Sequence, residues 1–222
     1  MIQKIIHLIK SILNRNVVID YKMLGMKRKN YIKIPRITNY IRIAALELAA
    51  YEINQKKLSG SVAEVGVFKG EFAKYINQLF PNKKLFLFDT FSGFDNKDIV
   101  VEKQNNFSDG NQDFSDTSAN LVLQKMKFRQ NCIIKKGYFP ETAVDVDEEF
   151  CFVSLDPDLY KPIIDGLDYF YPRLVKGGYI FIHDFNNDMY SGAKRAVLEF
   201  CSKYDIPYVP LPDTWGTVVI SK

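Results

Sequence analysis

The sequence predicts one α/β domain: a Rossmann-like, doubly wound, mostly parallel sheet that ends in an antiparallel hairpin. Strand-like and helix-like segments alternate from residue 61 to residue 204, as in repeated strand–helix–strand units. The strand-like segments are almost continuously apolar, which is typical of a parallel sheet covered on both faces. The last two strand-like segments are too close in sequence for a crossover helix between them, so they are expected to pair antiparallel.

The elements are expected in a regular order. The first is a helix from Thr38 to Lys57, with Thr38 or Asn39 as its N-cap. The expected strands that follow are Ser61–Gly66, Leu85–Asp89, Cys132–Lys136, Phe150–Asp156, Gly178–Asp184, Pro207–Leu211 and Thr214–Ile220. The expected helices are Lys69–Phe80, which Pro81 ends, and Asp116–Arg129, Tyr160–Leu174 and Ser191–Tyr204.

Two segments leave alternatives open. The polar stretch Thr90–Ser115 is expected to be a long loop, either a lid over a site or a disordered insertion. Trp215 in the final hairpin is interpreted as a core residue rather than as a platform for a sugar ring.

Charge divides the chain into a basic leader, residues 1–37, and a main domain, residues 38–222. Residues 1–42 hold ten Lys or Arg against the single acid Asp20, whereas the remaining residues hold 20 bases and 25 acids. An acidic main domain disfavours a nucleic-acid partner, which selects for basic surfaces. The composition, 47% hydrophobic and 25% charged, is that of a soluble globular protein. Its three cysteines are widely spaced in apolar stretches, which favours a reducing compartment and thus a cytoplasmic location.

The leader has isoleucines at helical spacing between Ile2 and Ile12. It is interpreted as a helix that docks on the domain or on a second subunit, which favours a homo-oligomer. The alternatives are a helix on the inner, anionic membrane surface through residues 1–35, and disorder.

Two acids at strand ends predict a nucleoside cofactor. Glu64 precedes Gly66 at the end of the first strand, where the glycine permits a tight turn and a buried carboxylate suits a cationic amino group. Asp89 ends the second strand, where an acid can accept both ribose hydroxyls. The spacing from Gly66 to Gly70 is GxxxG rather than GxGxxG, which disfavours a nicotinamide dinucleotide.

Acids also follow the fourth and fifth strands. Asp156 and Asp184 are expected at neighbouring strand ends, close enough to share a cation such as Mg²⁺ or Mn²⁺. Asp158 lies two residues after Asp156, so in extended backbone it would point to the same side. A cation bound to a sugar hydroxyl would lower its pKa, and a nearby carboxylate would remove the proton.

Six motifs in this order resemble the macrocin O-methyltransferase (TylF) family. They are EVGVFKG from Glu64, DTFSGF from Asp89, FSDTS from Phe114, GYFPET from Gly137, DPDLY from Asp156 and GGYIFIHDF from Gly177. The resemblance covers roughly residues 60–200. It implies a class I methyltransferase fold, S-adenosyl-L-methionine as the methyl donor, and a sugar or glycoconjugate hydroxyl as the acceptor.

The resemblance also implies roles for single residues. Glu64 and Gly66 would line the methionine end of the cofactor, Asp89 and Ser92 the ribose, and Asp116 and Ser118 the adenine. Asp116 has a second interpretation, as the N-cap of the helix after it. Asp156, His183 and Asp184 would hold the metal, and Asp158 would be the general base.

His183 departs from the family pattern, which has an acid at this position. It is interpreted as a metal ligand, as a base or substrate contact, or as a hydrogen-bonded residue at a strand end. Metal-independent methylation of a small molecule with His183 as the base is therefore an alternative function, as is a non-catalytic subunit that binds the cofactor.

Overall fold

The computed structural model describes residues 40–222 of the chain. The predicted leader helix and the expected N-caps Thr38 and Asn39 lie outside this part, and the division of the chain at residue 37 stays a prediction. Within residues 40–222, no helix combines the length and the apolar character needed to cross a membrane.

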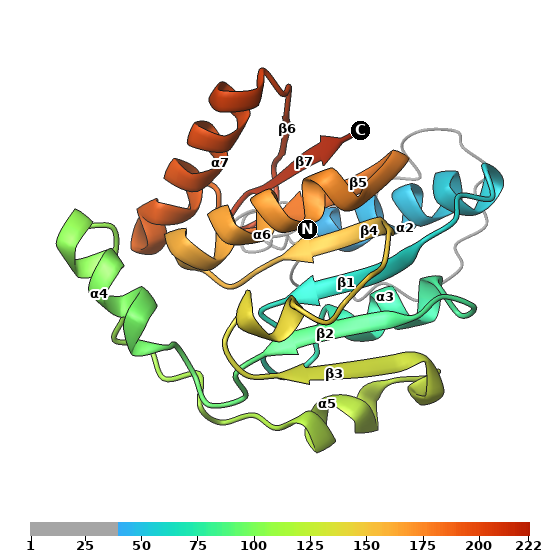
Figure 1. The fold of residues 1–222 in the computed structure, drawn as a ribbon, viewed down its shortest axis with the longest axis horizontal. Helices are drawn as coiled ribbons and strands as arrows, with labels where there is room; N and C mark the ends of the chain where they lie inside the picture. The colour runs from blue at the N-terminus through green and yellow to red at the C-terminus, as the bar shows by residue number, and fades with distance from the viewer. Residues whose placement is uncertain (1–39) are drawn as a thin grey trace, which may run out of the picture.

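The centre of the fold is a seven-stranded sheet with the order β3-β2-β1-β4-β5-β7-β6 (Figure 1). Neighbouring strands from β3 to β5 are parallel, whereas β7 pairs antiparallel with both β5 and β6. This arrangement confirms the predicted parallel sheet with its C-terminal hairpin. The strands are β1 Ser61–Val65, β2 Leu85–Asp89, β3 Cys132–Lys136, β4 Phe150–Leu155, β5 Leu174–Ile182, β6 Val209–Leu211 and β7 Thr217–Ser221.

Helices cover both faces of the sheet, with α6 on one side and α2 and α3 on the other (Figure 1). The helices are α2 Tyr40–Gln55, α3 Ala73–Leu79, α4 Asn96–Asn105, α5 Ala119–Lys125, α6 Tyr160–Arg173 and α7 Ser191–Tyr204. Short 3₁₀ turns lie at Arg129–Asn131, Glu141–Ala143 and Asp188–Tyr190.

The apolar core is divided between the two faces because successive strand residues point to opposite sides. Ala63 and Val65 of β1 belong to the cluster under α6 and α7, whereas Val62 belongs to the cluster under α2 and α3. By the same alternation, Glu64 points toward the side of α2. This places its carboxylate close to residues that α2 contributes.

The stretch from Thr90 to Ser115 contains α4, so its prediction as a loop throughout is wrong. Asp95 caps the helix by accepting a hydrogen bond from the Lys97 N–H at 2.9 Å, and Asn106 ends it in a left-handed conformation. The buried face of α4 is acidic: Asp98 accepts from the Tyr138 hydroxyl at 2.8 Å, and Glu102 accepts from the Tyr160 N–H at 2.8 Å. In Figure 1, α4 lies beyond the arrowheads of β1 and β2, next to the ends where the site forms.

Several predicted boundaries also differ from the structure. The expected helix from residue 69 begins only at Ala73, because Phe68 and Gly70 have left-handed backbone angles, with φ of 47° and 74°. The expected helix over residues 116–129 is reduced to α5, and β5 begins four residues earlier than expected. The remaining elements lie within a few residues of their predicted positions.

Candidate active site

A cleft of about 630 Å³ opens at the carboxyl ends of the parallel strands. The strand order reverses between β1 and β4, which is where open α/β sheets bind their ligands. The predicted residues Glu64, Gly66, Asp89 and Asp156 line this cleft, as do Asp158, His183 and Asp184. The structure therefore brings together the acids of four different strand ends.

Gly66 is held against the backbone that leaves β4. Its φ is 79°, and a Cβ at this position would lie 2.3 Å from the carbonyl oxygen of Asp156. Only glycine permits so close an approach. The turn after β1 and the turn after β4 therefore form one continuous wall of the cleft.

Glu64 has a buried carboxylate, with only 1% of the residue exposed. Burial raises its pKa well above the usual range, and the positive charge of Arg42 opposes that shift. Its Oε2 atom has no hydrogen-bond partner in the described part of the chain. An unpaired buried acceptor is costly, so this position favours a cationic or hydrogen-bond-donating ligand group.

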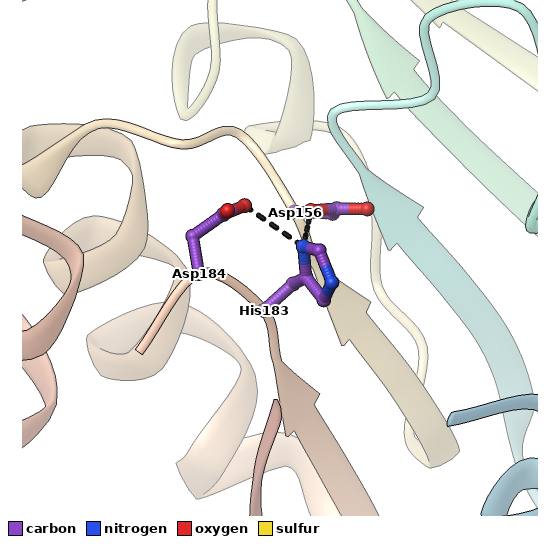
Figure 2. Close-up of side chains that lie close together, drawn as sticks. All are labelled: Asp156, His183 and Asp184. Atoms are coloured by element: carbon purple, nitrogen blue, oxygen red, sulfur yellow. Dashed lines mark hydrogen bonds and ion pairs between the residues drawn. The ribbon is translucent and has the colours of Figure 1, made fainter. Parts of the chain in front are cut away.

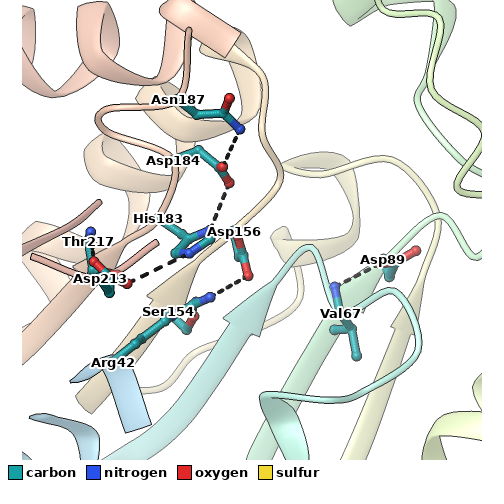
Figure 3. A network of polar contacts seen from close by, with 10 residues as sticks. All are labelled: Arg42, Val67, Asp89, Ser154, Asp156, His183, Asp184, Asn187, Asp213 and Thr217. Atoms are coloured by element: carbon teal, nitrogen blue, oxygen red, sulfur yellow. Dashed lines mark hydrogen bonds and ion pairs between the residues drawn. The ribbon is translucent and has the colours of Figure 1, made fainter. Parts of the chain in front are cut away.

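Asp89 organises the turn between β1 and α3. Its Oδ2 accepts from the Val67 N–H at 2.7 Å (Figure 3). The same oxygen accepts from the Phe68 N–H at 2.8 Å, and Oδ1 accepts from the Phe91 N–H at 2.6 Å. Burial raises the pKa of Asp89, and these backbone donors act against the increase. The carboxylate is thereby fixed in direction and still faces the cleft.

Asp156, His183 and Asp184 converge at the ends of β4 and β5 (Figure 2). The Nδ1 atom of His183 lies 3.0 Å from Asp156 Oδ1 and 2.8 Å from Asp184 Oδ2. Each residue offers one donor atom, and the three atoms lie within 4.8 Å of one another. Two carboxylate oxygens and one imidazole nitrogen at this spacing fit a divalent cation such as Mn²⁺ or Mg²⁺.

Charges around the cluster set the protonation of His183. Burial favours the neutral imidazole, but the charge of Asp156 and the hydrogen bonds to Asp156 and Asp184 together outweigh it and raise the pKa of His183 to about 9. Burial alone would raise the pKa of Asp156, whereas Arg42 and His183 hold it below its usual range. Without a bound cation, His183 therefore carries a proton at neutral pH and is not available as a base.

Asp158 reaches the same cluster by a different backbone route from the one predicted. Its φ is 62°, so the expectation of extended backbone after Asp156 is wrong. Burial, and then the charges of Asp184 and Asp156, raise its pKa well above the usual range. A half-buried carboxyl group beside two carboxylates is a strong proton acceptor once ionised.

Arg42 of α2 is a site residue that the sequence analysis missed. It is 2% exposed and donates to Asp156 Oδ2 at 2.8 Å and to Ser154 Oγ at 3.0 Å (Figure 3). Its guanidinium group also lies over the ring of Phe72. It was counted with the basic leader. The overlooked signal is its spacing: Arg42 stands one turn before Leu46, on the apolar face of the expected helix, where an arginine must have a partner.

Two further residues hold the cluster in place. Asn187 donates from Nδ2 to Asp184 Oδ1 at 2.7 Å. Asp213 lies on the turn between β6 and β7, and its Oδ2 is 3.8 Å from His183 Nε2 (Figure 3). Neither residue stands in a motif, so spacing alone gave no indication of them.

Three predicted cofactor residues lie outside the lining of the cleft. Ser92 and Asp116 are exposed, and Asp116 forms an ion pair with Lys69 at 2.6 Å. Ser118, not Asp116, is the N-cap of α5, and its Oγ accepts from Leu121 N–H at 3.2 Å. The interpretation of Asp116 as the N-cap is therefore wrong.

Comparisons with known proteins agree with this geometry. The macrocin O-methyltransferase (TylF) family model matches residues 11–216, while a search of curated proteins gives no match. The solved O-methyltransferase NovP superposes with a TM-score of 0.66 at 19% identity, covering 82% of this chain and 80% of that one. The calicheamicin methyltransferase CalS11 superposes with a TM-score of 0.66 at 18% identity, covering 95% of this chain and 89% of that one. The apo structure of CalS11, a TDP-rhamnose 3'-O-methyltransferase, superposes with a TM-score of 0.60 at 18% identity, covering 95% of this chain and 90% of that one.

The strand order, with its antiparallel C-terminal strands, is that of the class I methyltransferase fold. Because the family model spans most of its length, the chain belongs to the macrocin O-methyltransferase (TylF) family. It is accordingly an S-adenosylmethionine-dependent O-methyltransferase.

Proposed function

We propose that the protein methylates a hydroxyl of a sugar or glycoconjugate, with assistance from a divalent cation. The observation that supports this is the convergence of Asp156, Asp158, His183 and Asp184 in the cleft that also holds Glu64 and Asp89. One structural neighbour, CalS11, is a methyltransferase that acts on a sugar nucleotide, TDP-rhamnose. A cytoplasmic location, a homo-oligomer and membrane contact through residues 1–35 stay predictions.

The cofactor residues are assigned by their chemistry. Glu64 receives the ammonium group of the methionine end, because its Oε2 is buried without a partner. Gly66 allows the cofactor to approach the backbone, and Asp89 accepts the ribose hydroxyls. Ser92, Asp116 and Ser118 remain proposed contacts at the ribose and adenine end. When bound, S-adenosylmethionine supplies a sulfonium methyl group that an oxygen nucleophile displaces in line.

The acceptor end has two tasks, orientation and proton removal. Asp156, His183 and Asp184 would hold Mg²⁺ or Mn²⁺, which lowers the pKa of a coordinated hydroxyl. Asp158 takes the hydroxyl proton as the oxygen forms its bond to the methyl carbon and the carbon–sulfur bond breaks. Asp158 is favoured over His183 as the base, because a ring nitrogen of His183 that holds the cation has no free lone pair for a proton, and without the cation the carboxylates around His183 keep the imidazole protonated at neutral pH.

The test is a methyl-transfer assay with S-adenosylmethionine and a panel of sugars, both free and nucleotide-linked, read by mass spectrometry. We expect a product heavier by one methyl group, and a loss of at least a hundredfold in rate for Asp158→Asn. Asp168→Asn, an exposed aspartate on α6, serves as the matched control and should keep wild-type activity. If the protein methylates none of the sugars but does methylate another class of hydroxyl, the acceptor assignment is wrong.

Chelation tests the cation separately. We expect activity to disappear after treatment with EDTA and to return on addition of Mn²⁺ or Mg²⁺. Activity that is unchanged by EDTA would favour the alternative in which Arg42 and His183 alone neutralise the acidic cluster, since both already contact Asp156. The acceptor assignment does not depend on this result.

A further inference from the structure

Trp215 is exposed inside the cleft rather than packed in the core. It lies on the turn between β6 and β7, with 46% of the residue exposed, and it lines the same cleft as His183 and Asp184. The interpretation of Trp215 as a core residue is therefore wrong. A large aromatic ring left open to solvent beside acidic groups is a typical surface for an amphipathic ligand.

The turn that carries Trp215 is fixed to the catalytic end of β5. Phe185 N–H donates to Gly216 O and Asn186 N–H donates to Trp215 O, both at 2.9 Å. Both donors follow directly after Asp184. The position of the Trp215 backbone relative to the acidic cluster is thus set by hydrogen bonds that do not depend on what the indole contacts.

The other side of the turn is equally constrained. The buried carboxylate of Asp213 accepts from Thr217 N–H and from Thr217 Oγ1, both at 2.6 Å. Gly216 has a φ of 77°, and a Cβ there would lie 2.8 Å from Asn186 Nδ2. The turn therefore presents the indole from a rigid base, which limits the entropy lost when a ligand stacks on it.

The polar groups that share the cleft with the indole indicate what kind of ligand it takes. The same cleft is lined by hydrogen-bonding side chains that include Asp158, Asn187 and Gln112. A sugar ring matches this combination, because its hydroxyl rim binds polar groups while its C–H face stacks on an aromatic ring. A flat phenolic acceptor would use the indole but would leave most of these polar groups without partners.

We propose that Trp215 is the platform on which the apolar face of the acceptor sugar rests, so that it sets acceptor affinity without contacting the cofactor. This inference rests on the proposed function and names the residue that selects the acceptor class. It predicts that acceptor binding and cofactor binding respond separately to substitution of this side chain.

Because Trp215 is the only tryptophan of the chain, its fluorescence reports on the site directly. The probes are TDP-rhamnose, UDP-glucose and methyl rhamnopyranoside, added to the protein loaded with S-adenosylhomocysteine. We expect at least one of them to shift the emission to shorter wavelength, since a stacked sugar excludes water from the indole, whereas TDP alone should not. A shift by catechol but by none of the sugars, or no binding of any sugar, overturns the proposal.

Substitutions complete the test. Trp215→Ala should raise the acceptor KM about tenfold or more, and Trp215→Phe should raise it less, with kcat and the Kd of S-adenosylhomocysteine within about twofold of wild type. Val209→Ala, an exposed apolar residue of β6, is the control and should change none of these. An unchanged KM in Trp215→Ala would overturn the platform while leaving the methyltransferase assignment intact. If the wild-type protein methylates no sugar, the proposed function itself is wrong.

Discussion

Arg42 shows how one buried charge can support two functional groups. Its guanidinium group bonds Asp156 and Ser154, and its charge also acts on Glu64. Without Arg42, the carboxylate of Asp156 would keep only His183, among the described residues, as a cationic partner in a poorly solvated site. Arg42 therefore belongs to the folding energetics of the site as much as to its chemistry.

Replacing Arg42 should expose this dependence. We expect Arg42→Met to lower the free energy of unfolding by about 3 kcal/mol at neutral pH, because Asp156 keeps only His183 as a cationic partner in the described part of the chain and Glu64 loses the charge that opposes the effect of its burial. Urea denaturation followed by circular dichroism measures the change. Arg195→Met, which breaks an exposed ion pair with Glu199, is the control and should cost less than about 1 kcal/mol. Equal losses in the two variants would contradict this account.

Single residues also mark what sequence reasoning can and cannot reach. Glu64, Asp89, Asp156 and Asp184 were found because strand ends of a parallel sheet meet at one edge. Arg42 was missed because its role depends on how α2 packs on the sheet. The conformation of Asp158 was predicted wrongly because left-handed backbone at an aspartate is set by the surrounding turn.

At the scale of elements, α4 is the clearest failure of pattern-based prediction. Periodicity identifies a helix by an apolar stripe, but the buried face of α4 carries Asp98 and Glu102. Asp98 accepts a hydrogen bond from the Tyr138 hydroxyl, and Glu102 accepts one from the Tyr160 N–H through one of its two oxygens. Its caps, Asp95 and Asn106, are typical of helix ends and are the signal that was available. By contrast, β1, β2, β4 and α7 were predicted closely because their apolar patterns reflect burial in two separate core clusters.

The buried acid of α4 gives a pH-dependent prediction. Burial raises the pKa of Asp98 to about 6, opposed by the hydrogen bond from Tyr138. Because the pKa is higher in the folded state, the folded protein binds the extra proton, and stability falls as the pH rises from about 4 to about 6. Asp98→Asn removes this ionisation and keeps an oxygen that accepts from Tyr138. We therefore expect the variant to be about 2–3 kcal/mol more stable than wild type at pH 7.5.

The same comparison at pH 4 should show almost no difference, since Asp98 is then protonated in the folded wild type. Urea denaturation at the two pH values measures both differences. Asp109→Asn, an exposed aspartate just after α4, is the control and should stay within about 0.5 kcal/mol of wild type at each pH. If Asp98→Asn is more stable than wild type by the same amount at both pH values, the ionisation of Asp98 is not the cause of the increase in stability.

At the scale of the whole molecule, the cleft joins parts that belong to different layers. Glu64 faces α2 on one side of the sheet, whereas His183 and Asp184 continue from β5 toward α7. A cofactor that contacts the ends of β1, β2 and β4 would therefore connect segments that pack in separate core clusters. Ligand binding is expected to stabilise the domain as a unit rather than locally.

Thermal unfolding measures that stabilisation. At a concentration one hundred times its Kd, S-adenosylhomocysteine should add about 2.7 kcal/mol to the stability of the folded state. For a domain of this size, that corresponds to an increase of about 5–10 °C in Tm. NAD at the same concentration should leave Tm unchanged, because the GxxxG turn at Gly66 lacks the spacing for a pyrophosphate.

Glu64→Gln should reduce the increase in Tm that S-adenosylhomocysteine causes, since an amide cannot pair with the ammonium group as a carboxylate does. An increase in Tm with NAD but not with S-adenosylhomocysteine would contradict the cofactor assignment, and an equal increase in Glu64→Gln would remove Glu64 from it.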